Sequence, residues 1–295
     1  MQSNAKILAQ INSLQKRFHE LKEGNEALLR ILYEAEVADQ VYNSNAIENS
    51  TLTLDETDKI LREIHLERFI SERELFEAKN LARVVEYIHQ TAEQRDLEID
   101  SILLLHKMLI SNIRDDIAGR FREGNEWVRV GSHLGADPAK VRELLYSALV
   151  GYRVSAQDHI VKRMATLHLT FEHVHPFVDG NGRIGRVLNN YLLLRERHVP
   201  INIKYADRSL YYDAFDAFDT RGDTSLMEQI IARSLTSSYH KRIAYLERRE
   251  IIALKDYAKK FGFSASNLLN KAKRQTIEAF MEKGMWKIGI AQNMD

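Results

Sequence analysis

The sequence of 295 residues contains no cysteine and few of the residues that interrupt helices. The absence of cysteine excludes disulfide bonds, thiolate metal sites and a cysteine nucleophile. Only 3 prolines and 13 glycines are present, and apolar residues recur at helical spacing along most of the chain. We therefore expect a mainly α-helical protein.

The chain also lacks an excess of charge of either sign and any long apolar run. Lys+Arg and Asp+Glu number 42 each, which gives no general attraction to nucleic acid or to a membrane surface. No apolar run approaches the ~20 residues of a membrane span, and the N-terminus has no cleavable signal pattern. We expect a cytoplasmic protein without a membrane partner. Its length is sufficient for one large or two moderate domains.

What the sequence does contain is a dense cluster of chemically active residues between two apolar helical patterns. It reads His-Pro-Phe-Val-Asp-Gly-Asn-Gly-Arg-Ile-Gly-Arg, from His175 to Arg186. Pro176 disfavours the helical conformation for the residue before it, so the first helix should end at His175. Gly180 and Gly182 permit a tight turn, and the free N–H groups at the start of the second helix would then form an anion site.

The side chains of this cluster complete a polyphosphate site. Arg183 and Arg186 lie three positions apart on one side of the second helix, and each guanidinium can bind phosphate oxygens in a forked manner. Asp179 provides the oxygen ligands that Mg²⁺ prefers beside polyphosphate. His175 is a candidate general base because its ordinary pKa is near neutrality.

The cluster resembles the motif of the Fic family of adenylyltransferases, H-[PX]-F-x-[DE]-G-N-G-R-x-x-R, and matches every specified position. The resemblance covers roughly residues 40 to 235. It implies a Fic-fold helical bundle that transfers AMP from ATP to a Tyr, Ser or Thr hydroxyl of an unidentified target protein. Phosphotransferring relatives of Doc type carry Lys at the position of Gly182, so the glycine favours nucleotidyl transfer.

The resemblance also implies a role for each residue of the motif. His175 would deprotonate the hydroxyl, Asp179 would hold Mg²⁺ on the α- and β-phosphates, and Phe177 would point into the core. The expected phosphate contacts come from Gly180, Asn181, Gly182, Arg183 and Arg186.

A second family motif lies upstream, where Ser44, Glu48 and Asn49 match the inhibitory pattern [ST]-x-x-x-E-[GN]. Taken alone, these residues are typical of a polar helix end. Ser44 and Glu48 are four residues apart and share a helix face. The resemblance implies that Glu48 pairs with Arg186 and occupies the guanidinium that the ATP γ-phosphate would otherwise hold.

The segment from residue 118 to 138 is punctuated by glycine, and its best strand candidate is residues 127–130. In the family, a β-hairpin flap at this place aligns the target's backbone by strand addition. An ordinary surface hairpin is the alternative. The expected docking residues are Glu126, Trp127, Val128, Arg129, Val130 and Gly131.

A predicted helix over residues 209–218 carries Tyr211 and Tyr212. Aromatic residues at helical spacing commonly form core, but in Fic relatives a Tyr-Tyr pair packs by the adenine of ATP. Relatives carry Asn seven residues beyond the second tyrosine, where this chain has Asp219. A carboxylate only accepts hydrogen bonds, so the preference for adenine is left open.

The terminal regions differ in composition from the centre. We expect an N-terminal helical region over 1–95 with the inhibitory helix at about 40–50, a Fic core over 96–240, and a separate module over 250–295. The first helix has a two-heptad seam, which indicates packing within the domain or a homodimer. The seam residues are Ile7, Ile11, Leu14, Phe18 and Leu21.

The C-terminal region is basic: residues 241–287 contain 12 Lys+Arg and 5 Asp+Glu, so their net charge is 12 − 5 = +7. Two short helical patterns separated by Gly262, followed by a strand at 284–288, resemble a winged-helix-like helix-turn-helix module. Its Lys271, Lys273 and Arg274 could contact DNA phosphate. Such modules also bind proteins.

Three other functions remain open on the sequence alone. A metal hydrolase could use His168, His173 and His175. A regulator could bind DNA or protein through its C-terminal module, with the Fic core as sensor. The phosphate site could also remove AMP from a target, with Glu48 orienting water.

Overall fold

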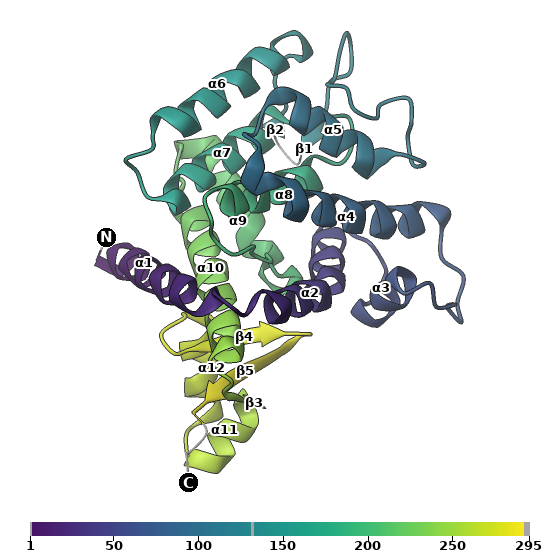
Figure 1. The fold of residues 1–295 in the computed structure, drawn as a ribbon. Helices are drawn as coiled ribbons and strands as arrows, with labels where there is room; N and C mark the ends of the chain where they lie inside the picture. Colours follow the sequence, from purple (N-terminus) through teal and green to yellow (C-terminus); the bar gives the residue numbers. More distant parts are fainter. Residues whose placement is uncertain (1, 131–132, 292–295) are drawn as a thin grey trace.

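The computed structural model describes residues 2–130 and 133–291, and it is mainly helical (Figure 1). The N-terminal half contains α1 (Gln2–Lys22), α2 (Glu26–Ile47), α3 (Leu54–Leu61), α4 (Glu72–Thr91) and α5 (Ile99–Ile110). Short antiparallel strands β1 (Arg129–Val130) and β2 (His133–Leu134) follow. The second half contains α6 (Val141–Val154), α7 (Ile160–Val174), α8 (Asn181–Arg195), α9 (Arg208–Arg221) and α10 (Ser225–Leu246).

Several of these helices begin where local sequence signals place them. Thr53 and Glu56 form a reciprocal capping box before α3, and the Ser71 side chain accepts a hydrogen bond from the backbone of Glu74 at the start of α4. Asp137 caps the short 3₁₀ turn that leads into α6. Each cap satisfies N–H groups that lack an intrahelical partner.

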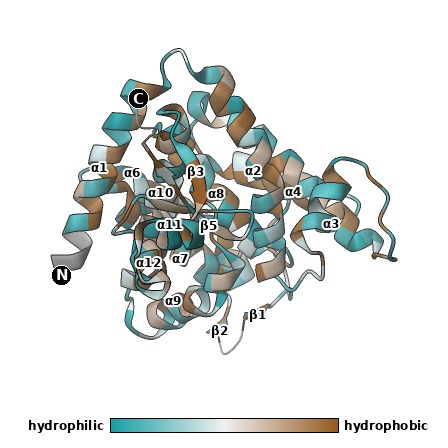
Figure 2. Ribbon diagram, turned by 90° about the horizontal axis from the view of Figure 1, so that it is seen from below, coloured by the Kyte–Doolittle hydropathy of each residue, from teal (hydrophilic) through white to brown (hydrophobic). Residues whose placement is uncertain are grey.

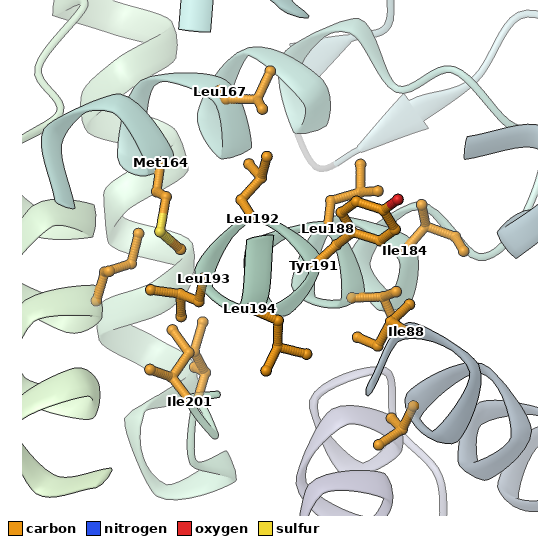
Figure 3. Packing of buried hydrophobic residues seen from close by; sticks show 14 of the residues in the cluster. Ile88, Met164, Leu167, Ile184, Leu188, Tyr191, Leu192, Leu193, Leu194 and Ile201 are labelled. Carbon is orange, nitrogen blue, oxygen red and sulfur yellow. The ribbon is translucent and has the colours of Figure 1, made fainter. Parts of the chain in front are cut away.

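Helix α8 lies at the centre of the larger core. Nearly all its residues are buried, and Figure 3 shows its apolar side chains pointing in several directions, toward Met164 and Leu167 of α7 and toward Ile88 of α4. A helix that is buried on all sides cannot move without disrupting the core around it. The motif from His175 to Arg186, which leads into α8, is therefore anchored in the larger core.

The apolar seam of α1 packs against another helix of the same chain. Ile11, Leu14 and Phe18 are buried, and α1 packs along α10. Phe18 contacts Tyr239 of α10 edge-on, with ring centroids 5.7 Å apart. The alternative of packing within the domain is therefore the one observed, and the homodimer alternative is not needed to bury this face.

The C-terminal module has a small core of its own, at the lower end of the molecule in Figure 1. It consists of β3 (Glu250–Ala253), α11 (Leu254–Phe261), α12 (Ala265–Lys273), β4 (Ala279–Glu282) and β5 (Met285–Ile290). The antiparallel sheet has the order β3-β5-β4. The expected C-terminal strand is present as β5. Lys241 of α10 joins the module to the rest by pairing with Glu36 of α2 at 3.0 Å and Glu282 of β4 at 2.7 Å.

Hydrophilic and hydrophobic residues alternate around the helices, which fits packing on one face and solvent on the other (Figure 2). Among the described residues, no helix is both long and apolar enough to cross a membrane.

Candidate active site

The loop between α7 and α8 carries the motif, and two residues with positive φ define its path. His175 ends α7 with φ 51°, and Gly180 precedes α8 with φ 84°. A Cβ atom at Gly180 would lie 3.0 Å from Cδ1 of Ile110 and 3.2 Å from Cδ2 of Leu109. Glycine is therefore required here both for its backbone conformation and for the close contact with α5.

The ring of His175 is mostly buried and oriented as a base. Its Nδ1 lies 3.3 Å from the carbonyl oxygen of Glu172, and a proton donated there leaves a lone pair on Nε2. The pKa of His175 is lowered to about 4, mainly by burial; the Glu172 carbonyl opposes this effect, and the nearby Arg122 guanidinium adds to it. The imidazole is therefore neutral at pH 7 and able to accept a proton.

Three side chains hold the motif loop from inside. Asn181 Oδ1 accepts a hydrogen bond from the Phe177 N–H, and its Nδ2 donates to the Phe177 carbonyl, both at 2.8 Å. Phe177 is fully buried, as expected, and stacks on His106 with ring centroids 3.7 Å apart. His106 accepts a hydrogen bond from Gly119 N–H at Nδ1 and therefore donates from Nε2 to the Asp179 carbonyl. Both atoms of the Asn181 amide are therefore used by the loop, although the residue also lines the cavity in front of it, and its expected contact with phosphate stays a prediction.

Arg122 joins the motif loop to the flap segment. Its buried guanidinium donates to the carbonyls of His175 at 2.7 Å, Glu126 at 2.8 Å, Ala136 at 2.7 Å and Val174 at 3.2 Å. The backbone N–H of Arg122 also bonds to the Pro176 carbonyl. A charged group satisfied by four carbonyls fixes all of them relative to one another.

A cavity of about 440 Å³ lies in front of the loop. Among the described residues, no side chain caps the N-terminus of α8, so the first N–H groups of that helix are available to the cavity as an anion site. The cavity is large enough for a polyphosphate, and both the candidate base His175 and the Asp179 carboxylate line it. Its lining includes Glu48, Arg73, Glu77, His175, Asp179, Gly180, Asn181, Gly182 and Arg183.

Asp179 and Arg183 belong to a four-membered ion-pair network at the cavity edge. The two Asp179 oxygens pair with Arg73 at 2.6 Å and with Arg183 at 3.1 Å, and Arg183 also pairs with Glu77 at 2.9 Å. Burial opposes ionisation of Asp179, but the two arginines outweigh it and lower its pKa. The carboxylate is therefore ionised and suited to hold a divalent cation, although Arg73 must give up its contact first.

Arg186 is buried, and its partners come from the end of α2. Its Nε donates to Ser44 Oγ at 2.9 Å, and its Nη2 donates to the Ser44 carbonyl at 2.8 Å and to Glu48 Oε1 at 2.9 Å. A Cβ atom at Gly182 would lie only 2.2 Å from Glu48 Oε1. The Glu48 carboxylate thus lies directly against the start of α8, where an anion would otherwise bind. Asn49 follows with φ 69° and accepts a hydrogen bond from Arg208.

The two tyrosines of α9 have different surroundings. Tyr211 is fully buried, and its hydroxyl lies 2.7 Å from His168 Nε2 and 3.4 Å from Arg186. Successive helical residues point about 100° apart, and Tyr211 points into the core, so its expected contact with the nucleotide stays a prediction. Tyr212 is partly buried, with Arg208 over its ring at 5.3 Å, and it remains a candidate for the base contact.

The predicted strand of the flap is shorter than expected. Only Arg129 and Val130 lie in β1, whereas Trp127 and Val128 precede it. Glu126 pairs with Arg120 at 2.8 Å and supports the base of the flap. Trp127 is half exposed, and Gly131 lies outside the described residues. A hairpin whose strands have two residues each, next to a half-exposed tryptophan, is compatible with docking a partner.

The hydrolase alternative is wrong, because its three histidines do not converge. His168 is buried against Tyr211 and Asn189, and burial lowers its pKa to about 3. His175 faces the cavity in front of the motif loop, and His173 points to Asp219 instead.

Four residues that support the site were not predicted from the sequence, because a lone histidine, arginine or glutamate forms no pattern until the chain is folded. These residues are Arg73, Glu77, His106 and Arg122.

The fold and the site define a mainly helical protein in which a glycine-containing loop beside a cavity leads into a central buried helix. Residues 96–193 match the Fic/DOC family, so the chain contains a domain of that family. The Protein adenylyltransferase Fic of Drosophila willistoni is 31% identical over 208 residues, covering 70% of this chain and 41% of that protein. That of Drosophila melanogaster is 32% identical over 208 residues, covering 70% and 42%. The chain therefore spans about two fifths of the length of these curated relatives.

Solved structures agree with this assignment. Fic-1 (aa134 - 508) from C. elegans has a TM-score of 0.73 and 26% identity, covering 83% of this chain and 73% of that one. A Fic family protein from Desulfovibrio desulfuricans G20 has a TM-score of 0.69 at 19% identity and covers 100% of this chain and 98% of that one. The second likeness extends the shared fold through the C-terminal module.

Proposed function

We propose that this protein is a protein adenylyltransferase that moves AMP from ATP to a Tyr, Ser or Thr hydroxyl of a target protein, and that Glu48 restrains it. The names of the curated relatives support the reaction. The single observation that carries the restraint is the capture of Arg186 by Ser44 and Glu48. The proposed reaction and the proposed restraint involve the same site, because Glu48 also lies against Gly182 at the start of α8.

In this proposal, the residues of the motif take the following parts in the transfer. The incoming hydroxyl loses its proton to Nε2 of His175, and its oxygen attacks the α-phosphorus of ATP. The bond from that phosphorus to the oxygen bridging to the β-phosphate breaks, and pyrophosphate leaves. The N–H groups of Gly182 and its neighbours at the start of α8 stabilise the charge that develops on the phosphate oxygens. Arg183 neutralises the phosphates beyond the bond that breaks.

Mg²⁺ fits the residues at the cavity edge. The Asp179 carboxylate is ionised, lies beside the anion site and supplies oxygen ligands. When bound, the cation would neutralise the α- and β-phosphates. Asp179 is then the ligand, and Arg73 would turn from the carboxylate toward phosphate or solvent.

The restraint follows from competition for one guanidinium. With its α2 partners in place, Arg186 cannot also bind the γ-phosphate, and Glu48 places a negative charge where that phosphate would lie. A γ-phosphate forced elsewhere misaligns the α-phosphate, and a displacement of about 1 Å can cost ~100-fold in rate.

The test uses ATP labelled at the α-phosphate, with Mg²⁺, and measures label on protein, including self-labelling. Wild type would be compared with Glu48→Gly, with Glu48→Gly/His175→Ala, and with a control, Glu67→Gly, which removes an exposed glutamate far from Arg186 in sequence. We expect Glu48→Gly to raise labelling by about 10-fold or more. The added His175→Ala should lower it by ~10²–10⁴-fold, the usual contribution of a general base.

Each part of the proposal can fail separately. Equal labelling by wild type and Glu48→Gly would disprove the restraint but not the transfer. No label with any variant would disprove the transfer. Loss of label from a pre-labelled target with wild type, but not with Glu48→Gly, would instead establish AMP removal.

The flap and Tyr212 complete the proposed substrate contacts. The flap residues from Glu126 to Val130 would align the target's backbone, and Tyr212 would pack by the adenine.

The C-terminal module would contact DNA or a protein through its basic helix α12, which carries Lys271 and Lys273. A DNA-binding role predicts affinity that falls steeply with salt. We place the protein in the cytoplasm as part of the same proposal.

A further inference from the structure

The flap, α7 and α9 bring three metal-ligating side chains together outside the phosphate cavity. His133 comes from β2, His173 from the last turn of α7 and Asp219 from the last turn of α9. Each offers one ligand atom, and these atoms all lie within 4.8 Å of one another. Across residues 2–130 and 133–291, this is the one group of three such side chains with that geometry.

The individual contacts show that the ligand atoms converge. His173 Nδ1 lies 2.7 Å from Asp219 Oδ1, and His133 Nδ1 lies 3.8 Å from Asp219 Oδ2. The two imidazole rings are adjacent, with centroids 4.2 Å apart. All three side chains are partly exposed, so an ion can reach them from solvent.

The ring of His133 is held in the orientation of a metal ligand. Its Nε2 donates a hydrogen bond to the backbone carbonyl of His173 at 2.7 Å. A proton on Nε2 leaves the lone pair on Nδ1, which is the atom that faces Asp219. Metal-binding histidines commonly have this arrangement, with the second ring nitrogen donating to a backbone carbonyl or carboxylate.

We infer that His133, His173 and Asp219 form a binding site for a divalent transition-metal ion of the zinc type. Two imidazole nitrogens and one carboxylate oxygen are a common zinc donor set, whereas Mg²⁺ prefers oxygen ligands. Water would fill the remaining position. The ion would connect β2 to α7 and α9 and would hold the flap against these helices. Its ligand His173 lies two residues before His175 in the chain.

The site also explains a departure in the sequence. Asp219 stands where the resemblance to Fic relatives leads one to expect asparagine. A carboxylate supplies the negative charge and the hard oxygen that a zinc-type ion uses, which a neutral amide does not provide. The aspartate at this position is therefore the residue most specific to the inferred site.

Calorimetric titration of ZnCl₂ into the full chain, without a histidine tag and without nucleotide, tests the inference. We expect one ion per chain, and with CoCl₂ the absorption spectrum of a protein-coordinated ion. His133→Gln, His173→Gln and Asp219→Asn should each weaken zinc binding at least about 10-fold, since even partners outside the ligand set change affinity by that much. MgCl₂ should not displace the zinc.

Two matched controls separate this site from the rest of the molecule. His65→Gln removes an exposed histidine elsewhere, and Asp179→Asn removes the proposed Mg²⁺ ligand; both should bind zinc as wild type does. In wild type, zinc should also slow hydrogen exchange in the flap, and this slowing should disappear in Asp219→Asn.

Several results would overturn the inference. One is full zinc affinity in any of the three ligand variants, shown by circular dichroism to be folded. Another is equal slowing of exchange in wild type and Asp219→Asn. The absence of zinc binding by wild type would show that Asp219 and His173 form only an ion pair.

Discussion

The motif loop (residues 175–182) and the flap segment (residues 123–130 and 133–134) lie next to each other, but the protein holds them in different ways. In the loop, Phe177 is fully buried, and Asn181 is buried with both its amide atoms bonded to loop backbone. In the flap, the paired strands contain only two residues each, and Trp127 and Leu134 are half exposed.

This difference corresponds to the proposed roles of the two segments. A reacting base must keep its position to within a fraction of an ångström, which requires a backbone determined by many buried contacts. A surface that aligns another protein's backbone must leave main-chain groups free to bond. Arg122 is the link, because its guanidinium binds carbonyls of both segments.

The largest expected effect comes from breaking this link. Arg122→Met should lower the free energy of unfolding by at least about 3 kcal/mol, because it removes several charge-assisted hydrogen bonds from buried carbonyls. Urea unfolding measures the loss. Arg129→Met, which removes an exposed arginine of the flap, should change stability little. A similar urea midpoint for Arg122→Met and wild type would show that the loop keeps its shape without the arginine.

An intermediate effect should follow from acid. Burial lowers the pKa of His106, His175 and His198 to about 4 and that of His168 to about 3, against an ordinary value of 6.5. Above pH 6.5 these rings are neutral in both the folded and the unfolded chain, so their contribution is fully present. As pH falls from 6.5 toward 4, the unfolded chain takes up protons first, and stability is lost. Burial raises the pKa of Glu172 to about 8 and also raises the pKa of Asp207, and these two carboxyl groups act in the opposite direction.

Urea unfolding at pH 7 and pH 5 measures this loss, which we expect to be about 2 kcal/mol or more. His106→Gln should flatten the pH dependence, by up to about 1.4 kcal/mol per pH unit, because glutamine does not titrate. An unchanged slope in this variant would show that His106 titrates alike in the folded and unfolded chain.

The smallest effect on stability should come from the flap, where the effect on function should be selective. Trp127→Ala should change the free energy of unfolding by less than about 0.5 kcal/mol, because the side chain is half exposed. In the Glu48→Gly background it should reduce AMP transfer to a target while leaving self-labelling intact. Tyr146→Ala, a similarly exposed aromatic on α6, is the control. Equal target labelling by both variants would remove Trp127 from the docking surface.

Local chemistry allowed much of the fold to be predicted from the sequence. Helical spacing, the Thr53 and Ser71 caps and the break at Gly24 place helix boundaries, because each acts through neighbours within a few residues. The chemistry of the motif could also be predicted from the sequence, because twelve consecutive residues carry the base, the carboxylate and the arginines. The pairing of Glu48 with Arg186 followed from a second motif.

Only the tertiary structure decided which groups each of these residues meets. Asn181 turned inward to bond the loop, and Tyr211 entered the core, because burial on a packed helix depends on what lies opposite. Arg122 and His106 became supports of the site through contacts with segments tens of residues away. His133, His173 and Asp219 converge from three separate elements. Spacing in the sequence carries no information about such contacts, because they arise from how whole helices pack.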